Sequence, residues 1–196
     1  MSITNYLIRN AKNSPKKIAY CIDDFKITNK ELYENIKNIS FNLKKRGIKK
    51  SDTIAIISNN SILYPQVILV AAYLDLKIAP LNPSLSKKDI ISQLNILEVK
   101  FLFSWNEYLK DLNFKKLNLS KDNCYDLDSR SINFKNFKDL FRENSKTSKL
   151  SIKNHYSKSD FLLGLSSGST SNPKIIMWSQ YVKILRSKHA KKIYSL

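Results

Sequence analysis

A nine-residue segment near the end of the sequence gathers the side chains that are best suited to bind phosphate. It reads Ser166-Ser167-Gly168-Ser169-Thr170-Ser171-Asn172-Pro173-Lys174 and follows the apolar run at residues 161–165. Hydroxyls and backbone N–H groups donate hydrogen bonds to phosphate oxygens, and a lysine adds a mobile positive charge. A hydroxyl can also join the ligands of a phosphate-bound Mg²⁺. The segment is therefore a candidate triphosphate-binding loop.

Two other interpretations of this segment have to be weighed. No Gly-Lys-Ser/Thr follows four residues after a glycine, so the Walker spacing of P-loop NTPases is absent. Clusters of Ser, Gly and Asn also occur in flexible linkers. However, Pro173-Lys174 is followed by the apolar residues 175–178. This pattern indicates a fixed turn between two strands, which makes a better binding site than a linker.

The elements upstream of this segment alternate between strand and helix. Apolar, β-branched runs predict strands at residues 52–58, 78–81 and 99–103. Helical patterns lie between them, at residues 62–74 and in a segment that opens at Ser86. This alternation predicts an α/β fold with a mostly parallel sheet flanked by helices.

The N-terminal third carries the clearest helix signal in the chain. Thr28 and Glu31 have the spacing of a capping box, and apolar residues then recur at steps of four, three and four. Before this helix we expect a short helix at Ile3–Asn13 and a hairpin of Ile18–Ile22 with Phe25–Thr28. Residues 105–156 read as loops with one or two short elements, and a further helix should start in residues 181–196. The apolar face of the capped helix consists of Leu32, Ile36, Ile39 and Leu43.

The formal charge of +18 suggests a phosphate-rich partner, either nucleic acid or an anionic membrane. The alternative is a coding bias toward adenine and thymine, because lysine outnumbers arginine by 29 to 5 and Asn and Ile are plentiful. Nucleic-acid sites normally rely on arginine for bidentate contacts, and the lysines are scattered. We therefore expect no nucleic-acid partner, and we rank a basic nucleic-acid binder last among the possible functions.

Cysteine and hydropathy patterns bear on the compartment. Cys21 and Cys124 lie in no CxxC motif, so neither a disulfide scaffold nor a zinc site is expected, and a reduced, cytoplasmic location fits. The longest apolar run, at residues 62–74, is too short to cross a bilayer. No transmembrane segment is therefore predicted.

Three segments in the correct order resemble the adenylate-forming superfamily of acyl-CoA synthetases, luciferases and peptide-synthetase adenylation domains. Residues 165–176 are similar to its signature S/T-S-G-S/T-T-G-x-P-K-G, residues 26–32 to L-T-Y-x-E-L, and residues 72–83 to G-x-x-x-A-G-x-x-x-x-P-L-N/D-P. Asn82 before Pro83, followed by Leu85, looks more like an acyl-CoA synthetase than an amino-acid-activating domain. The resemblance extends over nearly the whole chain.

The resemblance implies that residues 1–196 are the N-terminal portion of an AMP-binding domain that acts on ATP and a small-molecule carboxylate. Such enzymes form an acyl-adenylate, release pyrophosphate and then transfer the acyl group to a thiol such as that of CoA. Thr170 would place its hydroxyl near Mg²⁺. The residues implied to bind the ATP phosphates are Ser166, Ser167, Gly168, Ser169, Thr170, Ser171 and Lys174.

The chain departs from the family pattern at several positions. Ser171 and Ile175 stand where the signature has glycine, and Gln180 stands where a histidine often follows. Glycine allows positive φ or close approach of the backbone, so these changes would reshape the phosphate site. Ala72 and Asp75 replace small or glycine positions in the earlier segment. Together these changes indicate a divergent or decaying member.

Whole members of this superfamily are more than twice as long. By resemblance, the adenine and ribose segments, the metal-binding glutamate, the acyl pocket and the mobile C-terminal domain with its catalytic lysine are all missing here. We therefore expect a truncated fragment that is inactive alone, or one that pairs with a separate chain supplying the missing C-terminal part. The alternative is a non-catalytic module that binds nucleotide phosphates or another protein.

Overall fold

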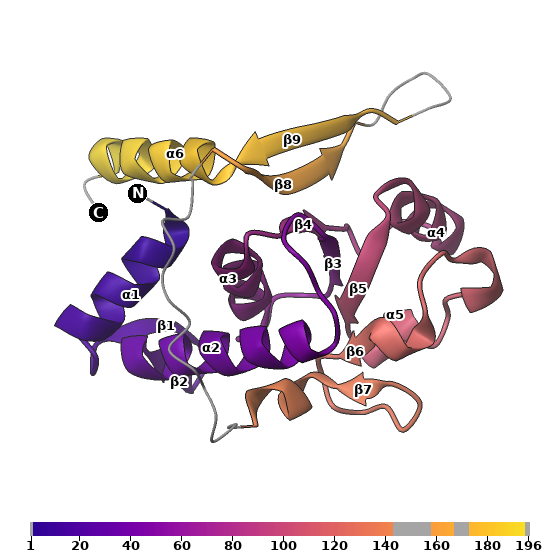
Figure 1. The fold of residues 1–196 in the computed structure, drawn as a ribbon, viewed down its shortest axis with the longest axis horizontal. Helices are drawn as coiled ribbons and strands as arrows, with labels where there is room; N and C mark the ends of the chain where they lie inside the picture. The colour runs from indigo at the N-terminus through magenta and orange to yellow at the C-terminus, as the bar shows by residue number, and fades with distance from the viewer. Residues whose placement is uncertain (1, 143–157, 167–172, 195–196) are drawn as a thin grey trace.

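The computed structural model describes residues 2–142, 158–166 and 173–194. Within this part of the chain the elements confirm the predicted strand–helix alternation (Figure 1). The helices are α1 (Ile3–Asn13), α2 (Asn29–Lys45), α3 (Tyr64–Leu74), α4 (Lys87–Ile96), α5 (Asn106–Leu109) and α6 (Gln180–Ile193). The strands are β1 (Ile18–Ile22), β2 (Phe25–Thr28), β3 (Thr53–Ile57), β4 (Lys77–Pro80), β5 (Val99–Ser104), β6 (Cys124–Asp126), β7 (Lys135–Asn136), β8 (Asp160–Leu165) and β9 (Ile175–Ser179).

The described strands form a seven-stranded sheet in the order β7-β6-β5-β3-β4-β8-β9, beside a separate β1–β2 hairpin. Neighbours in the sheet are parallel except for β8 and β9, which are antiparallel. The predicted α/β fold with a mostly parallel sheet is thus confirmed. Parallel strands need both faces covered, and this explains why all five residues of β3 are buried.

Alternate residues of β3 point into two separate cores. Ile54 and Ile56 belong to a cluster that also contains residues of α1, α2 and α3. Ala55 and Ile57 belong to a second cluster, built with residues of α4 and α5. Because side chains alternate across a strand, a single apolar run serves both faces of the sheet. Figure 1 shows α2 and α3 at some distance from α4, with β3 to β5 between them.

Helix α2 forms as predicted from its cap and its apolar face. The Thr28 side chain accepts a hydrogen bond from the Glu31 N–H, while the Glu31 carboxylate accepts one from the Thr28 N–H. The helix ends at Lys45, and Gly47 follows with φ of 85°, a conformation that glycine adopts without strain. The four predicted face residues, Leu32, Ile36, Ile39 and Leu43, are all buried.

The segment after β5 is more ordered than the expected loops with one or two short elements. Between Trp105 and Arg142 the structure has α5, β6, β7 and three short 3₁₀ turns. Strand β6 is three residues long, and its Tyr125 ring stacks on Phe103 with centroids 5.4 Å apart. These elements are too short to show a period in the sequence. Their neighbours hold them in place: β6 pairs with β5, and β7 pairs with β6. The described helices all fall short of the length and apolar character that a membrane-spanning helix needs.

Candidate functional site

Strands β8 and β9 hold the two ends of the candidate phosphate loop together. The pair is antiparallel, with Leu165 opposite Ile175. Beyond this pair, the Ser166 N–H donates to the Lys174 carbonyl at 2.9 Å, and the Lys174 N–H donates to Ser166 Oγ at 3.1 Å. The two strands predicted on either side of the loop are confirmed, while the turn itself falls on residues 167–172, outside the described part of the chain.

The structure places two of the predicted site residues. Ser166 is half-buried at the end of β8, and Lys174 is exposed at the start of β9. The two hydrogen bonds between them hold Ser166 and Lys174 next to each other at the base of the loop. The remaining predicted residues lie outside the described residues, and their roles stay predictions: Ser167, Gly168, Ser169, Thr170 and Ser171.

The bend lies at the edge of the sheet where an α/β protein usually binds its ligand. Strand β8 runs parallel to β4, with Leu162 opposite Ile78, so both strands end at the same edge. Strand β4 leads directly into Leu81 and Asn82, and the Asn82 side chain accepts a hydrogen bond from the Ser84 N–H at 2.9 Å. Ligands of open α/β sheets bind outside the carboxyl ends of the strands. Two segments that resemble family motifs therefore meet at one edge.

Asp75 ties the start of β8 to the body of the fold. It follows α3 with φ of 58° and is buried. Its carboxylate accepts a hydrogen bond from the Ser159 hydroxyl at 2.5 Å and forms an ion pair with Lys50 at 2.7 Å. Aspartate tolerates this left-handed conformation better than most residues do. The departure at Asp75 thus adds an anchor for the strand that leads to the loop.

Gly164 and Trp178 form a contact across the hairpin that the sequence interpretation missed. A Cβ atom on Gly164 would lie 3.0 Å from the Trp178 ring, so glycine leaves the space that the indole fills. The indole also lies close to Lys183, whose Nζ is 4.8 Å from the ring centroid. Burial, and then the charge of Arg186, lower the pKa of Lys183. A glycine inside an apolar strand, followed by tryptophan in the next strand, was the signal available.

Gln180, predicted to stand at a histidine position of the family pattern, joins three helices in the structure. It is buried at the start of α6, where its Oε1 accepts a hydrogen bond from the Ile3 N–H at 3.2 Å. Its Nε2 donates to the Ala72 carbonyl at 3.3 Å, and the Thr4 hydroxyl donates to the same oxygen at 3.0 Å. The side chain therefore joins α6 to α1 and α3. The amide is committed to these contacts.

The chain is similar to a family of AMP-binding enzymes and to individual members of known activity. The family model described as AMP-binding enzyme matches residues 7–191. The 2-succinylbenzoate–CoA ligase of Bacillus pumilus is 31% identical over 114 residues, which are 57% of this chain and 23% of that enzyme. The luciferin 4-monooxygenase of Photuris pensylvanica is 33% identical over 89 residues, which are 43% of this chain and 16% of that enzyme.

Solved structures share the fold at low sequence identity. The luciferase-like enzyme of the mealworm Zophobas morio superposes with a TM-score of 0.83 at 21% identity, covering 96% of this chain and 45% of that one. The O-succinylbenzoate coenzyme A synthetase of Bacillus subtilis, solved in complex with AMP, gives 0.75 at 19% identity, covering 98% and 37%. The chain spans less than half the length of each of these proteins.

Proposed function

The chain belongs to the AMP-binding enzyme family, and we propose that its part in that family's chemistry is to hold the ATP phosphates during carboxylate activation. A carboxylate oxygen attacks the α-phosphorus of ATP, and the bond from that phosphorus to the bridging oxygen breaks. The products are an acyl-adenylate and pyrophosphate. A thiol, in this proposal that of CoA, then takes the acyl group and releases AMP.

The hydrogen-bonded base of the loop between β8 and β9 is the observation that carries this proposal. Ser166 and Lys174 are held together by two hydrogen bonds, so the loop between them is presented from a fixed base. Its donors are hydroxyls and one ammonium group, a set that suits phosphate oxygens. Their work is to orient the nucleotide and to neutralise charge on the departing pyrophosphate.

The side chains of the loop also suit a Mg²⁺ ion bound to the nucleotide. The loop carries hydroxyls and no carboxylate, which fits one ligand position on a Mg²⁺ ion that arrives bound to nucleotide phosphates. Thr170 is the residue that we propose for this position. The bound ion would screen charge on the phosphates, while the chain's own hydroxyls and Lys174 orient them.

We further propose that the 196 residues alone do not catalyse adenylation at a useful rate. They span less than half of the solved relatives, and the proposal assigns the adenine site, acyl pocket and thiol transfer to additional polypeptide, on the same or a separate chain. The second candidate function is a non-catalytic phosphate-binding module. It is favoured by Ser171 and Ile175, which stand at glycine positions of the signature.

Titration of Mg-ATP into the purified chain, followed by calorimetry, tests phosphate binding. Lys174→Ala should weaken binding by about tenfold, the usual effect of removing a charge-assisted hydrogen bond. The matched control is Lys158→Ala, because Lys158 is also exposed but precedes β8 at its opposite end. Equal affinities for the two variants would contradict the proposed role of the loop.

Carboxylate-dependent pyrophosphate exchange separates the two candidate functions. The unaided chain should bind Mg-ATP and show no exchange above background under either function. Adding a polypeptide that carries the rest of the domain should restore exchange if the chain is half of an enzyme. A non-catalytic module would stay inactive in the same mixture, and exchange by the chain alone would overturn our proposal that it is inactive by itself.

A further inference from the structure

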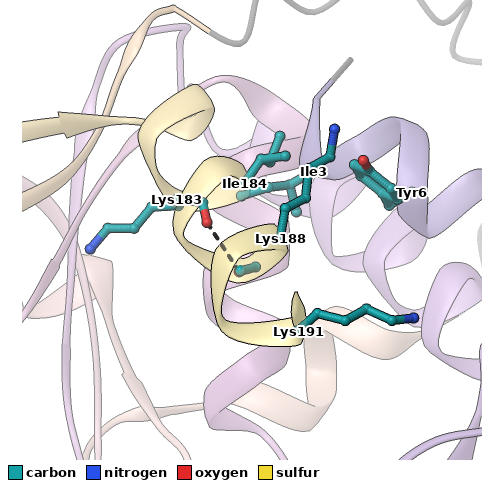
Figure 2. Close-up of a pocket in the computed structure, with 7 residues that line it drawn as sticks. Ile3, Tyr6, Lys183, Ile184, Lys188 and Lys191 are labelled. Atoms are coloured by element: carbon teal, nitrogen blue, oxygen red, sulfur yellow. Dashed lines mark hydrogen bonds between the residues drawn. The ribbon is translucent and has the colours of Figure 1, made fainter. Parts of the chain in front are cut away.

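A recess lies between helices α1 and α6, away from the β8–β9 bend (Figure 2). Its volume is about 320 Å³, and Ile3, Tyr6 and Ile184 supply its apolar surface. Lys188 and Lys191 come from successive turns of α6 on the same side of the recess. Figure 2 shows the Lys188 side chain running beside Ile3 toward Tyr6, and the Lys191 side chain extending past the other side of Tyr6. The recess therefore combines an apolar floor with a cationic rim.

The charge around this recess is uncompensated. Helices α1 and α6 together carry seven lysine and arginine residues, whereas all 16 aspartate and glutamate residues of the chain lie elsewhere. None of these seven cations forms an ion pair with a described carboxylate. A uniform lysine bias would leave acidic residues mixed among the basic ones, as they are between Asp23 and Glu143, where 15 of the 16 acidic residues lie. The two helices thus form a locally basic surface beyond that bias.

Buried contacts fix helices α1 and α6, which form the walls of the recess, relative to each other. Gln180 accepts a hydrogen bond from the Ile3 N–H and donates one to the Ala72 carbonyl, so the first turn of α6 is joined to the first turn of α1. One turn further along α6, the buried Ile184 faces Ile3 and Tyr6. Because the two helices are fixed to each other, the recess exists without a ligand and needs little rearrangement to receive one.

We propose that this recess binds a single-chain anionic amphiphile, with its apolar tail against Ile3 and Ile184 and its carboxylate or phosphate head between Lys188 and Lys191. The volume falls at the lower end of small-molecule sites, about 300–1,000 Å³. Free phosphate would leave the apolar floor unused. The head of a cationic amphiphile would be repelled by the positive charges of Lys188 and Lys191. This site is separate from the phosphate loop and goes beyond the proposed function.

Calorimetric titration with four probes, each below its micelle-forming concentration, tests the proposal. Decanoate and decyl phosphate carry the tail with either head, decyltrimethylammonium carries the tail with the wrong charge, and inorganic phosphate carries the head alone. The two anionic amphiphiles should bind with one-to-one stoichiometry and at least about tenfold more tightly than the other two probes. Whichever of decanoate and decyl phosphate binds more tightly identifies the preferred head group. Equal binding of decyltrimethylammonium, or binding of phosphate as tight as that of decyl phosphate, would overturn the proposal.

Variants on α6 locate the site. The double variant Lys188→Gln/Lys191→Gln should lose about tenfold or more in affinity for decyl phosphate. The control is Lys192→Gln, an exposed lysine of the same helix that does not line the recess, and it should bind as the unmodified chain does. Ser187→Phe, at an exposed lining position, should fill the recess and abolish binding while the thermal unfolding temperature stays unchanged. An equal loss in Lys192→Gln, or unimpaired binding by Ser187→Phe, would contradict the assignment.

Discussion

The centre of the sheet and the hairpin that carries the candidate site are built in different ways. All five residues of β3 are buried, whereas the first three residues of β9 are exposed. Strand β3 has a parallel neighbour on each side, while β9 pairs with β8 as the last strand of the described sheet. The centre is thus held by burial of ordinary aliphatic residues. The hairpin depends on a few particular residues, namely Asp75, Gly164 and Trp178.

The residues that stabilise the fold are therefore different from those that hold the candidate site in place. Many apolar residues can fill a core of the right volume, so the centre tolerates conservative exchange. A glycine beneath an indole and a buried carboxylate in the left-handed region have few substitutes. The predictions below test this division, from the largest expected effect to the smallest.

Truncation in the central strand should cost the most stability. Ile56 is fully buried, and Ile56→Ala should lower the free energy of unfolding by about 2–5 kcal/mol. Met177 of β9 is 53% exposed, so Met177→Ala should cost less than about 1 kcal/mol. Urea unfolding followed by circular dichroism measures both values. Equal losses would remove the distinction between centre and hairpin.

Removal of the Asp75 carboxylate should have the next largest effect. Asp75→Ala leaves Ser159 and Lys50 without their shared partner, and we expect a loss of about 2 kcal/mol, typical of hydrogen bonds to charged groups. The comparison is Asp111→Ala, which breaks an exposed ion pair with Lys87 and should cost about 0–1 kcal/mol. If Asp111→Ala proved as destabilising as Asp75→Ala, the anchor assigned to Asp75 would be wrong.

A methyl group on Gly164 should disturb the hairpin by a smaller amount. Gly164→Ala places a Cβ 3.0 Å from the Trp178 ring, and overpacking of this kind costs about 1–3 kcal/mol. We expect the lower end of that range because the indole is half-buried and can shift. In a Trp178→Leu background the same substitution should cost less. A double-mutant cycle measures the coupling, and strict additivity would show that the two residues do not interact.

The two cysteines should differ in reactivity without any change in stability. Cys21 is exposed on β1, whereas Cys124 is buried on β6, where burial raises the pKa of its thiol to about 12. Since the thiolate is the reactive species, a disulfide reagent at pH 8 should label Cys21 in the native chain and both residues after unfolding. Rapid labelling of two thiols in the native chain would indicate that the β6 region is open.

Much of the fold could be predicted because its signals are local and repeated. The capping box at Thr28 and Glu31, and the apolar steps that follow, predict α2 with its cap and its buried face. The central strands are β-branched runs between helices, so their type and parallel arrangement follow from the order of elements. Boundaries were less certain: the helix predicted over residues 62–74 begins at Tyr64 in the structure.

The remaining features arise from contacts between distant residues, which one sequence does not display. Strand β6 is three residues long and forms beside β5, with Tyr125 stacked on Phe103. Asp75 departs from the small or glycine residue of the family pattern, and its carboxylate accepts a hydrogen bond from Ser159, which is 84 positions away. Gln180 stands where the family pattern often has histidine, and its partners Ile3 and Ala72 precede it by 177 and 108 positions. A sequence motif can locate the loop. The residues that hold the loop in place can be recognised only from contacts in the folded structure.

Chemical-shift mapping tests the central claim most directly. Tripolyphosphate with Mg²⁺ is added to the ¹⁵N-labelled chain, and amide shifts are followed by two-dimensional NMR. The account predicts saturable shifts concentrated between Ser166 and Lys174, which Lys174→Ala weakens. Shifts spread over the lysines of α1 and α6 with the loop unaffected would show that phosphate binds by general charge, and the role proposed for the β8–β9 bend would be contradicted.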